Sequence, residues 1–469
     1  MPALMIQGAS SSAGKSLVTA GLARALRRRG VDVVPFKAQN MSNNARVVDG
    51  GEIGTAQYLQ ALAARLEPDV RMNPVLVKPE GDTRSQVVVL GRPDLELSRR
   101  AWRDRRDDLW PAIESSLQAL LDEHELVLLE GAGSPAEVNL RDTDLANMRS
   151  AKLARAAVAL VADIDRGGAF AHLYGTWALL REDERALICG FVLNKFRGDA
   201  SLLAPGPEQL RSLTGVPTVG VLPWLDHGLP DEDGAATPRR PGGRAPLVAV
   251  VRYPTASNLD ELKLLEQVAD LRWTADPAVV AEAGLVILPG SKRVGADLAW
   301  LHATGLAEAI RARAARGGRI LGICGGLQML GESVEDAAGV DGAGAGLGLL
   351  PLLTVFEGAK LTRRTETRFA ELPEPWAPLG GLALHGYEIR HGRTAATGPV
   401  EVALPGGLGW ASGPVLGVTV HGALEDPAIV EALVGASPRR TLDQAFETLA
   451  DSVEEHLDVD ALLAAARAA

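Results

Sequence analysis

The sequence alternates short apolar runs with amphipathic helical segments, and it does so twice, on either side of a segment rich in proline and glycine. The first series of expected strands comprises residues 4–7, 31–36, 87–90, 126–129, 157–162, 188–193 and 218–222, with helical patterns such as 15–29 and 54–65 between them. The second series comprises residues 247–251, 285–288, 320–323 and 415–420, with a strong helical pattern over 298–316. Such alternation predicts mostly parallel sheets with helices on both faces, and therefore an α/β fold in both halves.

The chain of 469 residues is long enough for two or three domains. Residues 229–246 lack apolar periodicity and are dense in proline and glycine, which is typical of a linker. We expect a first domain over residues 1–228, the linker over 229–246, a second domain over 247–440 and an amphipathic helical tail over 441–469.

Composition narrows the class of protein. The net charge of −11 argues against nonspecific nucleic-acid binding, and the two cysteines, Cys189 and Cys324, exclude a disulfide framework and a thiolate-rich metal site. The first residues lack a basic segment followed by a long apolar run, and no stretch has the length of an uncharged membrane span. We therefore expect a cytoplasmic enzyme with no nucleic-acid or membrane partner, and a homo-oligomer remains open.

Cys324 occupies the nucleophile position of a Gly-x-nucleophile-x-Gly elbow. The apolar run 320–323 ends at this cysteine, Gly322 and Gly325 flank it, and a helical pattern over 326–330 follows at once. The sharp turn of such an elbow tolerates only small neighbours, and it presents the thiol at a helix N-terminus, which favours the thiolate. The pattern favours a catalytic cysteine over a buried structural one.

A second motif follows the first expected strand. Gly8 and Gly14 enclose five residues, one more than the standard phosphate loop has, and Lys15 and Ser16 complete a Gly-Lys-Ser ending where a helix begins. Backbone amides of such a loop hold nucleotide phosphates, the lysine reaches the outer phosphates, and the serine hydroxyl ligates Mg²⁺. The sequence therefore predicts a nucleotide site in the first domain.

Acidic residues end two neighbouring apolar runs of the first domain. Glu130 follows the run 126–129, and Asp163 and Asp165 follow the run 157–162. Carboxyl ends of parallel strands line the crevice where ligands bind in open α/β sheets. We expect Glu130 to share the metal with Ser16, and for Asp163 and Asp165 a functional role and a solvated turn both remain open.

An ordered series of motifs resembles the cobyric acid synthase family, the glutamine-hydrolysing amidases of cobalamin biosynthesis. The resemblance covers nearly the whole chain, and the order of its motifs is highly specific. The motifs are the phosphate-loop variant, Pro-Phe-Lys-Ala-Gln-Asn-Met-Ser at 35–42, residues 51–57, residues 72–79, Glu-Gly-Ala-Gly-Ser-Pro-Ala-Glu-Val-Asn-Leu at 130–140, residues 162–168, Asn-Lys-Phe-Arg-Gly-Asp at 194–199, residues 288–292, the Cys324 elbow, Gly-Tyr-Glu-Ile at 386–389, and His-Gly at 421–422.

This resemblance implies a P-loop domain similar to dethiobiotin synthetase, followed by a domain similar to class I glutamine amidotransferases. It implies that glutamine, ATP and Mg²⁺ are used to add four amides to adenosylcobyrinic acid a,c-diamide, which gives adenosylcobyric acid. ATP would turn each carboxylate into an acyl phosphate, and ammonia released from glutamine would displace the phosphate. At neutral pH added ammonia is mostly ammonium, so a glutaminase is needed to release it unprotonated.

The resemblance also implies roles for individual residues. Lys37 would lie near the activated carboxylate and the γ-phosphate, Glu52 and Glu130 would complete the Mg²⁺ site with Ser16, and Asn194 would contact adenine. The polar residues expected to bind amides and carboxylates of the corrinoid are Gln39, Asn40, Ser42, Asn139 and Arg141.

In the second domain, Cys324 would attack the glutamine amide while His421, which follows an apolar run, moves the proton. Backbone amides of Gly325 and Gly290 would form the oxyanion hole. Glutaminase triads usually carry a glutamate two residues after the histidine, but this chain has Ala423 there, so a Cys–His pair or a substitute such as Glu425 is expected. His391, displaced by one position from the family pattern, receives no role.

Two alternatives remain. The related cobyrinic acid a,c-diamide synthase shares both domains, although segments 35–42 and 194–199 argue against it. A ParA/MinD-like ATPase switch would usually carry a second lysine early in the phosphate loop, whereas residues 9–13 contain none, and it would have no use for a glutaminase domain.

Overall fold

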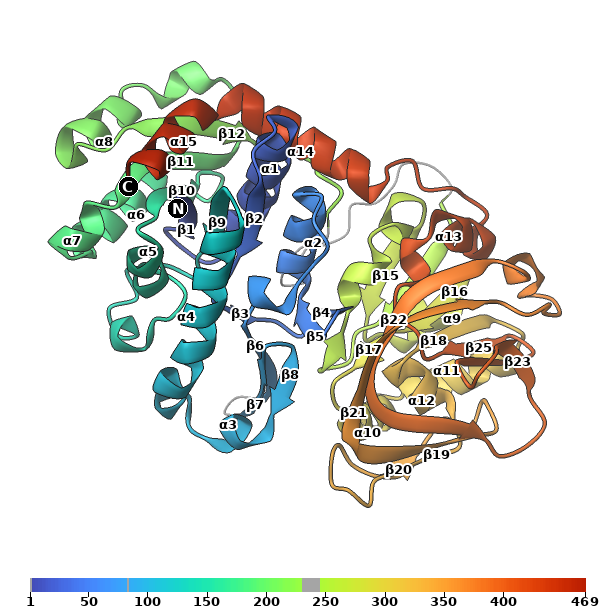
Figure 1. Ribbon diagram of the computed structural model, residues 1–469. Coiled ribbons are helices and arrows are strands. Elements are labelled where there is room, and N and C mark those ends of the chain that lie inside the picture. Colours follow the sequence, from blue (N-terminus) through green and yellow to red (C-terminus); the bar gives the residue numbers. More distant parts are fainter. Residues whose placement is uncertain (1, 82–83, 230–244) are drawn as a thin grey trace. The chain divides into compact units, whose positions relative to one another are not determined.

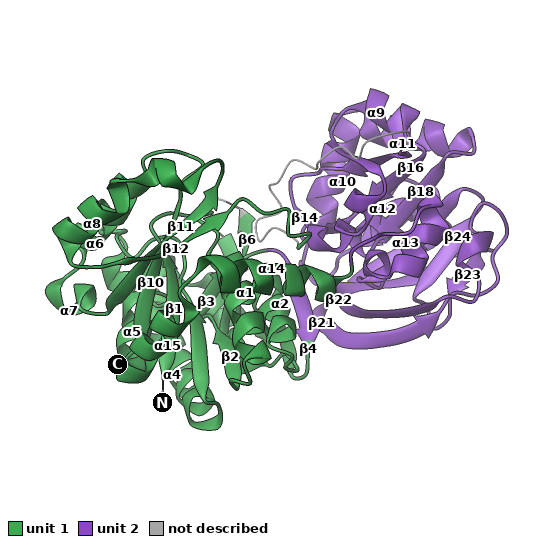
Figure 2. Cartoon of the chain, turned by 90° about the horizontal axis from the view of Figure 1, so that it is seen from above, with its two compact units in different colours: residues 1–42, 48–229, 441–469 green, residues 43–47, 230–440 purple. Residues whose placement is uncertain are grey.

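The computed structural model describes residues 2–81, 84–229 and 245–469, which form two compact units (Figure 1). Unit 1 comprises Met1–Ser42, Val48–Leu229 and Thr441–Ala469, and unit 2 comprises Asn43–Val47 and Pro230–Arg440 (Figure 2). Most of the expected linker, residues 230–244, lies outside the described residues. Among the described helices, none is both long and apolar enough to cross a bilayer.

Unit 1 is built on a six-stranded parallel sheet, as the alternation predicts. Six of the expected first-domain runs correspond to its strands. In spatial order these are β12 (Thr218–Pro223), β11 (Ile188–Phe196), β10 (Ala157–Asp163), β1 (Ala3–Gly8), β9 (Leu126–Glu130) and β2 (Val33–Phe36). Because β1 is central, the loop after it opens at the middle of the sheet, beside the ends of β9 and β10.

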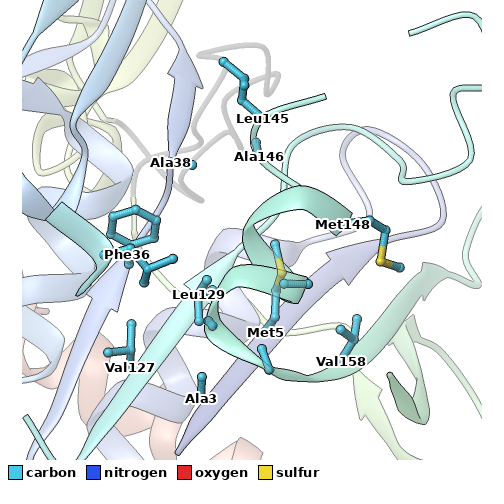
Figure 3. Packing of buried hydrophobic residues seen from close by; sticks show 14 of the residues in the cluster. Ala3, Met5, Phe36, Ala38, Val127, Leu129, Leu145, Ala146, Met148 and Val158 are labelled. Carbon is cyan, nitrogen blue, oxygen red and sulfur yellow. The ribbon is translucent and has the colours of Figure 1, made fainter. Parts of the chain in front are cut away.

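Side chains of β1 alternate between two cores, one on each face of the sheet. Met5 packs with Phe36 and Leu129 against helices on one face, a cluster seen in Figure 3, whereas Leu4 and Ile6 belong to the other core. Helices that contribute to the first core include α4 (Arg106–Glu123), α5 (Met148–Ala154), α6 (Ala169–Leu179) and α8 (Gly206–Thr214). Those that contribute to the second are α1 (Lys15–Arg28), α2 (Thr55–Ala63), α14 (Leu442–His456) and α15 (Val459–Ala468).

The C-terminal segment is part of unit 1 and not a separate tail. The apolar face of α14 packs along α1 and buries Phe446, while Arg24 of α1 forms ion pairs of 2.8 Å with Asp443 and 2.6 Å with Glu447. An amphipathic helix gains most of its stability from packing such a face, so this segment completes the core of the unit.

The expected strand over 87–90 does form, but not in the parallel sheet. It is β7 (Arg84–Val89), which pairs antiparallel with β6 (Val75–Gly81) and β8 (Arg92–Asp94) in a small sheet that also holds β3 (Gln39–Met41). Leu90 and Gly91 both have positive φ, which makes the tight turn into β8. The remaining elements before β9 are β4 (Ala45–Val48), β5 (Gly51–Gly54) and α3 (Leu95–Arg99), and α7 (Glu182–Arg185) precedes β11.

Unit 2 has a seven-stranded sheet whose first five strands are parallel. Its spatial order is β15 (Asp270–Thr274), β13 (Leu247–Val251), β16 (Leu285–Leu288), β18 (Arg319–Ile323), β25 (Val415–Val418), β24 (Gly409–Ser412) and β23 (Glu401–Leu404). The last two strands pair antiparallel. All four expected strands of this half lie in the sheet, and β18 and β25 are neighbours, which brings the ends of the two strands that precede Cys324 and His421 together.

The helix expected over 298–316 is wrong as a single element. The structure has α10 (Val294–Ala303) and α11 (Leu306–Ala315), separated at Thr304 and at Gly305, whose φ is +75°. A glycine in the left-handed region ends a helix, although the apolar pattern continues across it. Other elements of the unit are α9 (Pro277–Glu282), α12 (Gly325–Leu330), α13 (Pro427–Val434), β14 (Ala256–Ser257), β17 (Gly290–Ser291), β19 (Ser333–Glu335), β20 (Gly344–Ala345), and the long hairpin β21 (Leu352–Arg368) and β22 (Ala383–Ala396).

Candidate active sites

Cys324 joins β18 to α12 with a backbone conformation that few residues adopt. Its φ is +51° and its ψ is −104°, and the residue is 5% exposed. Space around the turn is short, since a Cβ added to Gly326 would lie 1.9 Å from the carbonyl oxygen of Leu288. A non-glycine residue at positive φ is strained and is found mostly at functional sites. The elbow geometry expected from the sequence is therefore present.

His421 lies beside this cysteine, where the loop after β25 begins. It is 1% exposed, and its side chain hydrogen-bonds Cys324. Its Nδ1 lies 2.9 Å from Oε1 of Glu261, while the amide of Gly422 donates to Oε2 of the same carboxylate at 3.0 Å. With Nδ1 held by Glu261, Nε2 is the ring nitrogen left for the thiol.

The environment of His421 favours its charged form. Burial alone would lower the pKa of the imidazole, but the negative charges of Glu261 and Cys324, and hydrogen bonds to both, raise it to about 10. The arrangement is that of a charged imidazole between a carboxylate and a thiol, which is suited to holding a thiolate.

Glu261, and not Glu425, is the acid that faces this histidine. Glu425 pairs instead with Arg46, which also pairs with Asp260. Ala423, at the usual place of the triad glutamate, is buried and apolar. Sequence motifs could not indicate Glu261, because it lies 160 residues before His421 and outside any motif.

The short strand β17 carries the expected oxyanion residue Gly290 to the same place. A Cβ on Gly290 would lie 2.9 Å from Cε1 of His421, and a Cβ on Gly325 would lie 2.6 Å from the amide nitrogen of Ser291. Asp297 holds this strand, since it accepts hydrogen bonds of 2.6 Å from the hydroxyls of Ser291 and Thr255. Gly290, Gly325, Cys324 and His421 are therefore gathered in one place within unit 2.

The glycine-rich loop in unit 1 runs from β1 into α1 as expected. Gly14 has a φ of +95°, and a Cβ there would lie 2.1 Å from the side-chain nitrogen of Asn194, which donates to the carbonyl of Ala13 at 2.9 Å. Lys15 folds over the loop and donates to the carbonyls of Ser10 and Gly133 at 3.2 and 3.0 Å. A Cβ on Gly8 would lie 2.7 Å from the backbone carbonyl oxygen of Ser10, so that position also needs a glycine.

Glu130, at the end of β9, gathers several polar groups beside this loop. Its Oε1 accepts hydrogen bonds from the hydroxyl of Ser16 at 2.9 Å and from the ammonium of Lys37 at 2.8 Å, and Gln60 donates to its Oε2. Lys37 and Glu130 are both buried. Gln60, of α2, carried no sequence signal, because it lies inside an ordinary amphipathic helix.

The other acidic candidates of unit 1 have different partners. Glu52 is buried and pairs with Lys78, a separate ion pair from that of Glu130. Asp163 pairs with Lys195 at 2.8 Å, and Lys195 also donates to the carbonyl of Ser12 in the loop at 2.7 Å. Asp165 is exposed and pairs with Arg197, so it takes no part in the Asp163–Lys195 pair.

The residues expected to bind the acceptor substrate are spread over several elements. Gln39 and Asn40 lie in β3, and Asn40 donates to Gln57 at 3.1 Å. The backbone amide of Ser42 donates to Val77, and Asn139 is exposed. Arg141 lines a cavity of 290 Å³ whose walls are rich in cations, formed by Arg106, Pro135, Arg141, Asp142, Asp144, Met148, Arg149, Lys152, Arg181 and Glu184.

The donors of unit 1 fit a nucleotide with Mg²⁺. Gly14 leaves a cradle that a larger residue would fill, Lys15 supplies a cation, and Ser16 and Glu130 bring a hydroxyl and a carboxylate into contact. Within the described residues, no group of three or more His, Cys, Asp or Glu could hold a metal ion by itself. A hydroxyl and a carboxylate are groups that Mg²⁺ sites combine with phosphate oxygens and water.

Comparisons with known proteins cover both units. Residues 4–230 match the family model described as the CobQ/CobB/MinD/ParA nucleotide binding domain, and residues 247–428 match that of the CobB/CobQ-like glutamine amidotransferase domain. A cobyric acid synthase of Polaromonas naphthalenivorans (strain CJ2) is 55% identical over 97% of this chain and 97% of its own length. Those of Paracidovorax citrulli (strain AAC00-1) and Variovorax paradoxus (strain S110) are 57% and 54% identical, over 97% and 98% of both chains.

Proposed function

Because the chain belongs to the cobyric acid synthase family, and is thus a ligase of cobalamin biosynthesis with a glutamine amidotransferase domain, we propose the reaction in detail. The enzyme amidates the b, d, e and g side-chain carboxylates of adenosylcobyrinic acid a,c-diamide, with glutamine and ATP, to give adenosylcobyric acid. The observation that carries this proposal is that one chain holds both a Cys–His–Glu constellation and a phosphate loop beside a buried Lys37–Glu130 pair.

In the glutaminase half, residues 247–440, the thiolate of Cys324 attacks the amide carbon of glutamine. The protonated His421 gives its proton to the leaving ammonia, and a glutamyl thioester forms, which water then hydrolyses to glutamate. Amides of Gly325 and Gly290 stabilise the oxyanion; loss of one such donor typically costs ~3 kcal/mol of transition-state stabilisation. Glu261 fixes the tautomer and orientation of His421, which its contact with Nδ1 supports.

In unit 1, which carries the synthetase site, the loop from Gly8 to Ser16 binds the phosphates of ATP, and Lys15 neutralises charge on the transferred phosphoryl group. Ser16 and Glu130 would hold the Mg²⁺ that accompanies ATP, and Glu52 would complete the metal site. Asn194 contacts adenine. Lys37 would leave Glu130 to meet the acceptor carboxylate and the γ-phosphate. The shared contact of Ser16 and Lys37 with Glu130 supports this assignment.

The acceptor is a polycarboxylate, so its site needs cations in a protein whose net charge is −11. The cavity at Arg141, whose lining has five cationic and three acidic side chains, supplies them, and Asn139 lies two residues before Arg141. Gln39, Asn40 and Ser42 supply amide and hydroxyl groups for the amidated side chains.

The test is mass spectrometry of the a,c-diamide incubated with the protein, ATP, Mg²⁺ and glutamine. Four successive mass changes, each corresponding to replacement of one hydroxyl by an amino group, are expected. If cobyrinic acid is amidated twice and the a,c-diamide is left unchanged, the acceptor is that of the a,c-diamide synthase. ATP turnover that needs neither corrinoid nor glutamine would favour the ATPase switch.

A further inference from the structure

A five-residue segment of the N-terminal sequence belongs to the glutaminase unit. Asn43–Val47 groups with unit 2, whereas the residues before and after it belong to unit 1. The preceding strand β3 and residue Ser42 are proposed to bind the acceptor, and β5, just after the segment, carries Glu52. The chain thus enters unit 2 and leaves it again within the stretch that carries candidate synthetase residues.

Within unit 2, this segment is held by buried polar contacts. Arg46 has a side chain 4% exposed; its Nη1 donates to the hydroxyl of Tyr387 at 2.9 Å, and its Nη2 pairs with Asp260 and Glu425. Asn258 donates to the carbonyl of Ala45 at 3.1 Å and to the Tyr387 hydroxyl at 2.7 Å. Arg46 and Asn258 therefore converge on the same phenol oxygen.

The partners of Arg46 are the neighbours of the candidate catalytic histidine. The ring of Tyr387 stacks on the imidazole of His421, with centroids 5.3 Å apart and planes 20° apart. The backbones of the same two residues exchange hydrogen bonds of 3.1 and 2.9 Å. Asp260 directly precedes Glu261, which holds Nδ1 of His421. Arg46 therefore fixes both the ring that covers the imidazole and the turn that carries its carboxylate.

The buried charge of Asp260 makes loss of its contact with Arg46 costly. Asp260 is 1% exposed on its side chain, so withdrawing Arg46 would leave a buried carboxylate without that cation, which is strongly unfavourable. The turn at Asp260–Glu261 would have to rearrange when the segment leaves, and the orientation of His421 would change with it.

We propose that Arg46 is a positioning residue for His421, through which the segment Asn43–Val47 makes glutamine hydrolysis depend on occupancy of the synthetase site. Ligands that order the flanking stretches 39–42 and 48–54 favour the state in which Asn43–Val47 makes its contacts within unit 2. These contacts in turn align the imidazole of His421. The inference rests on the proposed function for the identity of those ligands, a polycarboxylate acceptor and a nucleotide.

The test uses Tyr387→Phe, which keeps the ring on the imidazole but removes the oxygen that Arg46 and Asn258 bind. Glutamate release is measured with and without the a,c-diamide and Mg-ATP, and ammonium-driven amidation is measured in parallel. In the unsubstituted protein the acceptor and Mg-ATP should raise kcat for glutamine at least tenfold. In Tyr387→Phe this ratio should fall close to one, with the KM for glutamine and ammonium-driven amidation unchanged.

Arg46→Lys and Arg46→Gln separate positioning from folding. Arg46→Lys keeps the charge beside Asp260, so it should retain part of the stimulation that Arg46→Gln loses. Tyr174→Phe, at an exposed tyrosine of α6, is the matched control and should keep the full ratio. An unchanged ratio in Tyr387→Phe and Arg46→Gln would overturn the inference, as would an equal loss of ammonium-driven amidation.

Failure of the proposed function gives a different result. If the unsubstituted protein makes no amide from the a,c-diamide even with ammonium, the proposed acceptor is wrong and the inference falls with it. If ammonium-driven amidation proceeds but the acceptor does not stimulate glutamate release, the inference alone is overturned.

Discussion

Two buried glutamates hold the candidate reactive groups of the two units, and their partners give them different roles. Glu130 accepts from a lysine and a serine beside the phosphate loop, whereas Glu261 accepts from an imidazole and a backbone amide. A carboxylate that faces a loop for phosphates can exchange its partners for a metal ion. One that faces a histidine stabilises the imidazolium and fixes its orientation.

Substitution of Cys324 by alanine separates the two half-reactions. Cys324→Ala should abolish glutamine-dependent amidation, because no thiolate remains to release ammonia, and it should preserve ATP-dependent amidation with a high concentration of ammonium salt. The rescued rate should rise with pH, since a larger fraction of ammonium is then free ammonia. Product formation is followed by mass spectrometry. Normal glutamine-driven activity would place the nucleophile elsewhere.

Glu261→Gln should lower kcat for glutamine by about 10²-fold or more, because His421 loses the partner that orients it. It should also shift the pH profile. Burial works against the imidazolium, and the negative charge of Glu261 is among the interactions that raise the pKa of His421 to about 10, so removing that charge lowers the pKa. The alkaline limb of glutaminase activity, where His421 loses its proton, should therefore move to lower pH.

The matched control for this profile is Glu431→Gln, on the exposed face of α13. It should leave both kcat and the alkaline limb as they are. An alkaline limb that stays in place in Glu261→Gln would show that this carboxylate does not act on His421.

Each candidate site lies where a strand ends and a helix begins. At both places the connecting turn has a glycine position that leaves no room for a larger residue. The glycine-rich loop connects β1 to α1, and the Cys324 elbow connects β18 to α12. Local chemistry specifies both turns, so the motifs predicted their positions from the sequence.

Gly14→Ala should strongly lower ammonium-driven amidation and leave intact the basal glutamate release that is measured without acceptor and Mg-ATP. The added methyl would lie 2.1 Å from the amide nitrogen of Asn194, so the loop or Asn194 must move. Gly30→Ala is the control for backbone strain, because Gly30 also has positive φ, +81°, but nothing lies within 4 Å of the added carbon. It should cost about 1–2 kcal/mol of unfolding free energy and leave amidation normal. Equal amidation by the two variants would remove the loop from the synthetase site.

Contacts between distant parts of the sequence are what the motifs could not predict. Glu261 meets His421 from 160 residues away, and Arg46 meets Tyr387 from 341 residues away. The apolar periodicity also gave wrong predictions where a local turn ended or redirected an element. The glycine at 305 ends a helix inside an unbroken apolar pattern, and the strand near 87 takes an antiparallel partner because a tight turn at Leu90 and Gly91 continues it into a hairpin.

On the scale of the whole molecule, the two units do not simply follow one another along the chain. Unit 1 contains the first and the last segments of the sequence, and unit 2 contains most of what lies between them. The core of unit 1 on the α1 face includes side chains of both α1 and α14. Neither segment can bury its apolar face without the other.

Phe446→Ala should destabilise unit 1 by about 3–5 kcal/mol, because it leaves a cavity where α14 packs on α1 and removes the ring beside Arg24. Chemical unfolding followed by circular dichroism measures the change, with glutamate release as a probe of unit 2. Leu213→Ala, at a leucine of α8 that is 63% exposed, should change the unfolding free energy by less than about 0.5 kcal/mol. Similar unfolding midpoints for the two variants would contradict the structural role of α14.

The position of α14 and α15 also orders events on the ribosome. As the nascent chain emerges, α1 appears early, but the helices that cover its apolar side are translated only after all of the glutaminase segment. Unit 1 therefore cannot reach its native core before unit 2 has been made. A chain whose translation stops anywhere before residue 441 therefore leaves the apolar side of α1 uncovered.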